Sequence, residues 1–148
     1  MKKTILVIIC IIIITLVIFF NWYITNKKAF NEINSFNNYF ISYIEDDTGK
    51  SKSITGIELT TLMNKAIDNN EQYNLKKSKN GAYILNNENS LEILIKVDSD
   101  GEYYLMEAYA ISGMTSFTTL YGGVEFKCVK KEYHENGRIS KLIFEIIE

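Results

Sequence analysis

The chain has 148 residues, a formal net charge of −2 and no proline, so it has room for one membrane segment and one small domain. It contains no run of basic residues, which excludes the electrostatic signature of a nucleic-acid-binding protein. Only two cysteines occur, Cys10 in an apolar run and Cys128 far along the chain, and we expect no disulfide bond between them.

An apolar run lies close to the N-terminus. It covers residues 5–20 without a charge and continues to residue 24, which gives twenty residues. At about 1.5 Å per residue, a helix of this length spans the roughly 30 Å hydrocarbon layer of a bilayer. We therefore expect residues 1–26 to form a transmembrane anchor that contacts membrane lipid through residues 4–24.

The end of the run indicates that the anchor is retained. A cleavable signal peptide has an apolar core of about 7–15 residues followed by small residues. Here the run ends in Phe19, Phe20 and Trp22, bulky side chains that suit the membrane–water boundary instead. Lipidation at Cys10 is disfavoured because Ile9 precedes it, whereas a lipidated cysteine follows a small residue.

The orientation of the anchor depends on its flanks. Lys2 and Lys3 stand against Lys27 and Lys28, so the positive-inside rule gives almost no bias. A very short N-terminal flank usually stays in the cytoplasm. We therefore expect residues 27–148 to form a single extracytoplasmic domain at the cell membrane.

A membrane helix joined to a small sheet domain is also the architecture of type IV pilins. Their signature is a leader cut after glycine, with a glutamate early in the apolar segment. The first glycine here is Gly49, and the apolar run contains no glutamate. The sequence therefore lacks the processing motif, and a subunit that is only pilin-like in shape remains as an alternative.

Helical periodicity continues beyond the lysines. Apolar residues recur at spacings of three and four; they are Phe30, Ile33, Phe36, Phe40, Ile41 and Ile44. Since neither proline nor glycine occurs before Gly49, we expect the transmembrane helix to continue into a stalk helix up to about Glu45. The asparagines between these positions could recognise sugars or amides, but they also suit a solvated face.

A second amphipathic helix follows a polar turn. Thr55 and Glu58 have the spacing of a capping box, and one apolar face begins at Leu59. We expect Asp68, Asn69 and Asn70 to weaken this helix and end it.

The remaining sequence predicts strands and turns. "LEILIKV", "EYYLMEAYA", "VEFKCVKKEYH" and "RISKLIFEII" read as strands, and "MTSFTTLY" as a short helix. Asn80-Gly81 and Asn136-Gly137 are hairpin signals. The predicted fold class is α+β, with an antiparallel sheet of four or five strands after the helices.

Two stretches, "GIELTTLMNKAIDNNE" and "FKCVKKEYHENGRISKLIFE", resemble segments of small single-pass membrane proteins of low-GC, clostridia-type bacteria. The resemblance extends from the second helix to the end of the chain. It implies an architecture and no activity, so no catalytic residue can be carried over from it.

Few residues suggest catalysis or metal binding. His134, the only histidine, could act as a base but reads as a polar residue beside a turn. Asp98, Asp100 and Glu102 alternate around a turn, yet their spacing departs from that of a calcium loop. We expect no enzymatic activity, no cofactor and no metal, and we assign no catalytic residue.

Tyrosines are the remaining candidates for binding, since they are good interface anchors; they are Tyr103, Tyr104, Tyr109, Tyr121 and Tyr133. Half-buried positions in a sheet are the alternative. The leading hypothesis is a membrane-tethered, non-enzymatic interaction module whose partner is an envelope protein or the cell wall, bound through a sheet face or edge strand. A pilin-like envelope subunit and a small membrane-bound enzyme are the alternatives.

Overall fold

The computed structural model describes residues 2–98, 101–112 and 114–147. It confirms the α+β fold class: a long N-terminal helix, further helices and a five-stranded sheet. The chain divides into two compact units, Met1–Ser35 and Phe36–Glu148. The second unit holds the sheet and the hydrophobic core.

The first helix, α1, is continuous over Lys2–Ile44, as the lack of proline and glycine before Gly49 predicts. Its segment Ile8–Ile44 includes a stretch long and apolar enough to cross a membrane, judged by length and composition. Within residues 36–44 of the same helix, Phe40 and Ile44 are buried in the core of the second unit.

The second helix, α2, covers Gly56–Gln72 and has the predicted capping box. The Glu58 backbone N–H donates to the Thr55 hydroxyl at 3.3 Å, and the Thr55 N–H donates to the Glu58 carboxylate at 2.8 Å. The prediction that Asn69 and Asn70 end the helix is wrong. Both lie inside α2 and are buried, because each side chain finds a backbone partner in the protein interior.

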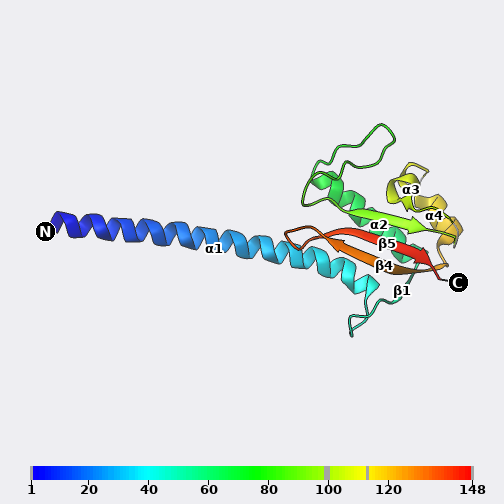
Figure 1. Cartoon of the computed structure of the whole chain (residues 1–148), viewed down its shortest axis with the longest axis horizontal. Helices are drawn as coiled ribbons and strands as arrows, with labels where there is room; N and C mark the ends of the chain where they lie inside the picture. The colour runs from blue at the N-terminus through cyan, green and yellow to red at the C-terminus, as the bar shows by residue number, and fades with distance from the viewer. Residues whose placement is uncertain (1, 99–100, 113, 148) are drawn as a thin grey trace. The chain divides into compact units, whose positions relative to one another are not determined.

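The sheet has the strand order β1-β4-β5-β2-β3 (Figure 1). The strands are β1 (Ser53–Thr55), β2 (Glu92–Lys96), β3 (Tyr104–Leu105), β4 (Glu125–Tyr133) and β5 (Ile139–Ile146). Three of its pairings are antiparallel, in agreement with the predicted antiparallel sheet, although no strand was predicted at β1. The fourth pairing differs, because β2 and β5 run parallel. The sheet is therefore mixed, since the C-terminal strand inserts between β4 and β2.

Two short helices, α3 (Met106–Ser112) and α4 (Met114–Tyr121), precede β4. The structure confirms α4, whereas the prediction of a strand over "EYYLMEAYA" is largely wrong. Only Tyr104 and Leu105 pair with β2, and the chain is helical from Met106 onward. Met, Glu and Ala are good helix formers, and here they outweigh the strand preference of the tyrosines.

Tight turns join the strands where glycine permits a positive φ. Gly137, with φ of +83°, lies in the hairpin between β4 and β5, and Gly81, with φ of +85°, lies in a turn closed by the Lys77–Tyr83 bridge. Both hairpin signals of the sequence are therefore confirmed as turns. A different constraint acts at Gly56, where an added Cβ would lie 1.9 Å from the Tyr121 carbonyl oxygen.

Candidate functional site

The two faces of the sheet differ in their side chains. Successive residues of a strand point to opposite faces, and one face is buried, with its residues at most 7% exposed; they are Ile93, Ile95, Phe126, Cys128, Leu142 and Phe144. The other face, here called the open face, remains accessible to solvent. Its residues are Glu92, Leu94 and Lys96 of β2, Lys127, Lys130 and Glu132 of β4, and Lys141, Ile143 and Glu145 of β5.

Charges on the open face are paired between and along strands. Lys141 Nζ lies 2.7 Å from Glu92 Oε2 on the neighbouring strand, and the hydrogen bond to Glu92 raises the pKa of Lys141. Lys130 Nζ lies 2.6 Å from Glu132 Oε1, and that hydrogen bond lowers the pKa of Glu132. The face thus presents both signs of charge in close alternation around two partly buried aliphatic side chains, Leu94 and Ile143.

One tyrosine extends the open face. The Tyr103 hydroxyl donates a hydrogen bond to Glu145 Oε1, and this bond raises the pKa of Tyr103. The Lys96 ammonium lies 5.7 Å from the centroid of the Tyr103 ring, a cation–π distance. Tyr103 therefore contacts charged residues of the open face on both β2 and β5.

The five candidate tyrosines do not form one exposed cluster. Tyr103, Tyr104 and Tyr133 are 45%, 44% and 49% exposed. Tyr109 and Tyr121 instead pack against buried Phe117, with ring centroids 4.7 Å and 5.1 Å from it. Burial raises the pKa of Tyr109 to about 12. These two tyrosines pack in the core, so of the five candidates Tyr103, Tyr104 and Tyr133 are available to a partner.

His134 closes the hairpin between β4 and β5. Its backbone N–H donates to the Arg138 carbonyl at 2.8 Å, and the Gly137 N–H donates back to the His134 carbonyl at 2.9 Å. Its ring Nε2 lies 2.8 Å from the Ser90 carbonyl oxygen, where a protonated nitrogen donates to that oxygen. The imidazole thus ties the hairpin to the segment before β2, in agreement with its interpretation as a turn residue.

Cys128 points into the core and is 7% exposed. Its Sγ lies 3.4 Å from the Lys130 carbonyl oxygen. Burial raises the pKa of the Cys128 thiol to about 11, which keeps it protonated and poorly nucleophilic at neutral pH. Cys10 and Cys128 are both free thiols.

The acidic turn is described only in part, because Asp100 lies outside the described residues. The Gly101 N–H donates to the Asp98 carbonyl at 3.3 Å. Among the residues that the structure describes, no group of three or more His, Cys, Asp or Glu side chains could hold a metal ion. The calcium hypothesis thus gains no geometric support from this part of the chain.

Two asparagine side chains pair with the starts of neighbouring parallel strands. Asn70 Nδ2 donates to the Leu91 carbonyl at 2.8 Å, and the Leu91 N–H donates to Asn70 Oδ1 at 2.9 Å. Asn37 likewise donates to the Gly137 carbonyl at 2.8 Å and accepts from the Ile139 N–H at 2.9 Å. Each side-chain amide supplies one donor and one acceptor, as a neighbouring strand would, so α2 holds the start of β2 and α1 holds the start of β5.

Arg138 lies between these two asparagine contacts and is 5% exposed. Its Nη2 donates to Asn69 Oδ1 at 2.5 Å. The guanidinium carbon stacks 3.5 Å from the centroid of the Phe36 ring and 5.3 Å from that of Tyr73. This stacking covers the charge with aromatic rings and fastens the hairpin to Phe36 of α1 and to Tyr73, which follows the end of α2.

Sequence reasoning missed this polar cluster, although a signal for it exists. The apolar stripe of α2 runs through Leu62, Met63 and Ala66, and three and four residues further on the same stripe reaches Asn69 and Asn70. Helical periodicity alone therefore predicts that both asparagines are buried. The partners of these side chains lie far away in the sequence, so their hydrogen bonds could not be predicted.

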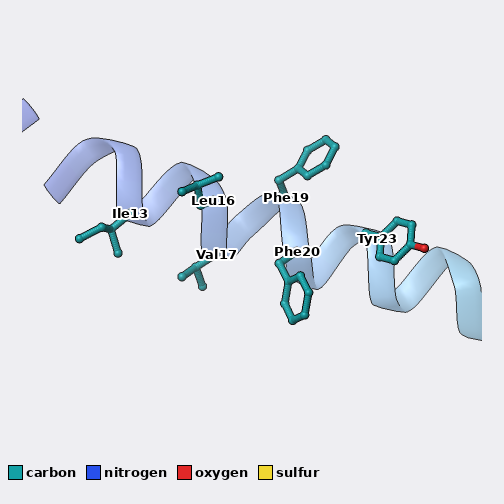
Figure 2. Close-up of a pocket in the computed structure, with 6 residues that line it drawn as sticks. All are labelled: Ile13, Leu16, Val17, Phe19, Phe20 and Tyr23. Atoms are coloured by element: carbon teal, nitrogen blue, oxygen red, sulfur yellow. The ribbon is translucent and has the colours of Figure 1, made fainter. Parts of the chain in front are cut away.

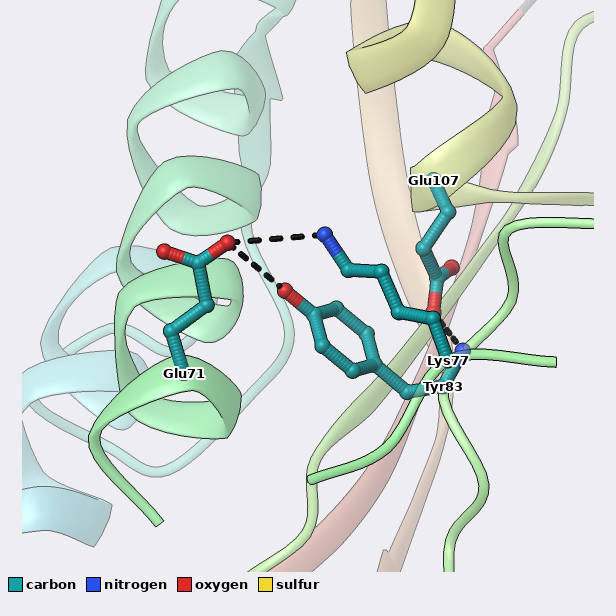
Figure 3. Close-up of polar contacts among 4 residues, drawn as sticks. All are labelled: Glu71, Lys77, Tyr83 and Glu107. Atoms are coloured by element: carbon teal, nitrogen blue, oxygen red, sulfur yellow. Dashed lines mark hydrogen bonds and ion pairs between the residues drawn. The ribbon is translucent and has the colours of Figure 1, made fainter. Parts of the chain in front are cut away.

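A third group of polar contacts holds the long connection between α2 and β2 (Figure 3). The Tyr83 N–H donates to Oε1 of Glu107 at 3.0 Å, and the Tyr83 hydroxyl donates to Glu71 Oε1 at 3.2 Å. Lys77 Nζ lies 3.4 Å from Glu71 Oε1 and 4.7 Å from the Tyr83 ring centroid. Glu107 is 5% exposed, so the connection is fastened to the domain by a buried carboxylate.

In the first unit, the apolar side chains of α1 leave a groove along the helix (Figure 2). Its walls are Ile13, Leu16, Val17, Phe19, Phe20 and Tyr23. A single helix cannot enclose a cavity, so this space lies between neighbouring side chains and is open on its outer side. Lipid chains or an apolar helix have the chemistry to fill it.

The chain therefore offers three surfaces to a partner: the open face with Tyr103, the exposed Tyr104 and Tyr133, and the apolar exterior of α1. Its buried polar residues hold strands and loops in place. No protein-family model, curated protein or solved structure matches this chain, so its function is inferred from its own residues.

Proposed function

We propose that the protein is a membrane-tethered, non-enzymatic interaction module of a bacterial cell envelope. The observation that carries this proposal is the exposure of apolar side chains along α1. Ile18, Phe19 and Phe20 are 63–65% exposed, in a stretch without a charged residue. Water would solvate such a surface unfavourably, whereas hydrocarbon would solvate it well.

The domain supplies the binding surface in this proposal. A sheet with helices on one face and mixed charges on the other resembles a recognition surface more than a packing surface, because opposite charges interspersed with aliphatic residues can select a partner by complementarity. In this proposal the partner is an envelope protein or the cell wall, and the domain faces outward.

The test combines the intact mass of the membrane-extracted protein with protease treatment of whole cells. We expect the full-length mass and loss of the domain on treatment, with lysed cells and a cytoplasmic protein as controls. A shortened N-terminus would contradict the tether. A full-length protein that is digested in lysed cells but not in whole cells would contradict the outward orientation.

A pilin-like subunit of an envelope assembly is the second candidate, because the groove on α1 could be filled by copies of the same helix. Cys10 is exposed on this helix, whereas Cys128 is buried. Crosslinking through Cys10 in native membranes therefore distinguishes the two functions, with Cys10→Ser as control. An assembly gives a ladder of higher oligomers, and an isolated tether does not.

A further inference from the structure

One edge of β4 is only partly covered. On the side away from β5, the strand that pairs with β4 in the described part of the chain is β1, and its register covers residues 125–127. Before β1, Ser51 forms its strand-type bridge with Glu45 and not with β4, and it reaches β4 only through its hydroxyl, which donates to the Cys128 carbonyl at 2.9 Å. Residues 129–133 of β4 thus present a strand edge that no described strand occupies.

We propose that this edge pairs with the same edge of a second copy, antiparallel and centred on Lys131. The pairing deepens the proposed function by naming the partner, and it relies on that function only for the membrane that concentrates the two copies. Between two irregularities of β4, residues 130–132 keep a regular register with β5. These three residues can therefore serve as the centre of a twofold strand pair.

Charge complementarity supports this register. With Lys131 opposite its own copy, Lys130 lies opposite Glu132 of the second copy, and the reverse pair forms by symmetry. In one chain these two side chains already attract each other, at 2.6 Å, and both are accessible on their strand. The central Lys131 is ion-paired with Glu45 of its own chain, which offsets the repulsion between the two central lysines.

Apolar complementarity continues at the next positions. Counted along the chain, Val129 comes opposite Tyr133 of the second copy; each lies at an irregularity of β4, and both side chains are 49% exposed. A pocket of about 230 Å³ lies beside Val129, between the β4 edge and the turn after α1; its lining includes Ile44, Gly49 and Ser51. Since a cavity of roughly 150 Å³ holds benzene, this pocket has room for the ring of Tyr133 from the second copy.

The size of the contact implies a weak dimer. A strand edge of five residues buries less surface than a stable interface in solution needs, and the irregularities of β4 limit its extent. Two chains tethered to one membrane, however, meet at a much higher effective concentration than free chains do. We therefore expect the pair to form in membranes and to dissociate in dilute detergent.

Disulfide trapping of the full-length protein in membranes tests the register. In a Cys10→Ser background, Lys131→Cys should give a covalent dimer on mild oxidation, because opposite residues of an antiparallel pair lie within disulfide range. Val129→Cys mixed with Tyr133→Cys should crosslink as well. Thr119→Cys, exposed on α4, is the control. Trapping of Lys131→Cys no greater than that of the control would overturn the proposal.

A charge exchange separates pairing from folding. Added to the Lys131→Cys variant, Lys130→Glu and Glu132→Lys should each reduce disulfide trapping several-fold, since each places like charges opposite one another. The double exchange K130E/E132K should restore it. Equal trapping in all four backgrounds, with unchanged thermal unfolding, would overturn the twofold register. Membrane fractionation of the unmodified protein separately tests the tether, so failure of the pairing and failure of the proposed function remain distinguishable.

Discussion

Two stretches of α1 use the same residue types in opposite environments. Residues 8–24 expose Ile, Val and Phe side chains along the helix, with Phe19 65% exposed, whereas Phe40 and Ile44 in residues 36–44 are 0% and 1% exposed. The difference lies in what surrounds each stretch, because residues 36–44 pack against the core of the second unit, whereas the side chains of residues 8–24 are exposed. An apolar helix sequence therefore does not specify whether protein or lipid will cover it.

Truncating one phenylalanine in each stretch should give the largest contrast. Phe40→Ala leaves a cavity in the core and should lower the free energy of unfolding by about 3–5 kcal/mol. Phe19→Ala, the matched control, should leave unfolding of the domain unchanged within about 0.5 kcal/mol. Chemical denaturation in detergent measures both. Equal destabilisation by the two variants would show that residues 8–24 also support the folded domain.

A charge introduced into residues 8–24 tests whether membrane lipid covers this stretch. Leu16→Arg should weaken membrane insertion by about 3–4 kcal/mol, the difference between leucine and arginine at the centre of an inserted helix. The thermal unfolding of the domain should not change. Alkaline extraction of membranes measures insertion, with Leu16→Ile as control. Unchanged extraction of the arginine variant would argue against a membrane-spanning role for this stretch.

Within residues 36–44, two neighbouring asparagines differ in their contacts and allow a matched test. Asn37 bonds to the hairpin between β4 and β5, while Asn38 is exposed. Asn37→Ala leaves two backbone groups without their partner and should cost about 1–3 kcal/mol of stability. Asn38→Ala should cost less than about 0.5 kcal/mol. Equal effects in denaturant titrations would contradict a structural role for the Asn37 amide.

Alkaline pH acts on one buried and one partly buried group of the core. Burial raises the pKa of Cys128 from 9.0 to about 11 and that of Tyr109 from 10.0 to about 12. The folded protein therefore keeps these protons over a range where the unfolded chain loses them. The stability they contribute is complete below about pH 9 and is lost as the pH rises towards about 11 and 12.

Denaturant titrations between about pH 8 and 12 measure this loss. Cys128→Ala should flatten the decline between about pH 9 and 11. Tyr109→Phe should flatten it between about pH 10 and 12, and Tyr133→Phe, at an exposed position, serves as control. An unchanged slope in the first two variants would show that other groups cause the alkaline loss.

Local signals in the sequence predicted much of the fold. The capping box at Thr55 and Glu58, the two glycine turns and the long first helix depend on residues within a few positions of one another, so one sequence suffices to find them. The strand prediction for "EYYLMEAYA" failed because tyrosines that suit a strand precede residues that suit a helix. The alternation of apolar and polar residues indicates which face of the sheet each side chain points to. It does not indicate which distant strands pair or whether they run parallel, so the parallel β2–β5 pairing could not be predicted.

The candidate surface was less predictable than the fold. Sequence reasoning named Tyr103 and Tyr133, which are exposed, together with Tyr109 and Tyr121, which pack on Phe117. It did not anticipate the Glu92–Lys141 pair, because these residues meet only through the parallel pairing. The register between strands determines which of their side chains become neighbours on the surface. Because distant strands take up this register only in the folded chain, such neighbours could not be predicted from the sequence.

The central place of β5 has a consequence for how the chain is made. This strand, Ile139–Ile146, lies between β4 and β2, yet it is synthesised after the other four strands of the described sheet. Residues 36–44 of α1 are therefore made long before the strand whose first residue, Ile139, bonds to Asn37. The sheet is complete only after synthesis has passed residue 146, so a chain interrupted before β5 lacks the strand that joins β4 to β2.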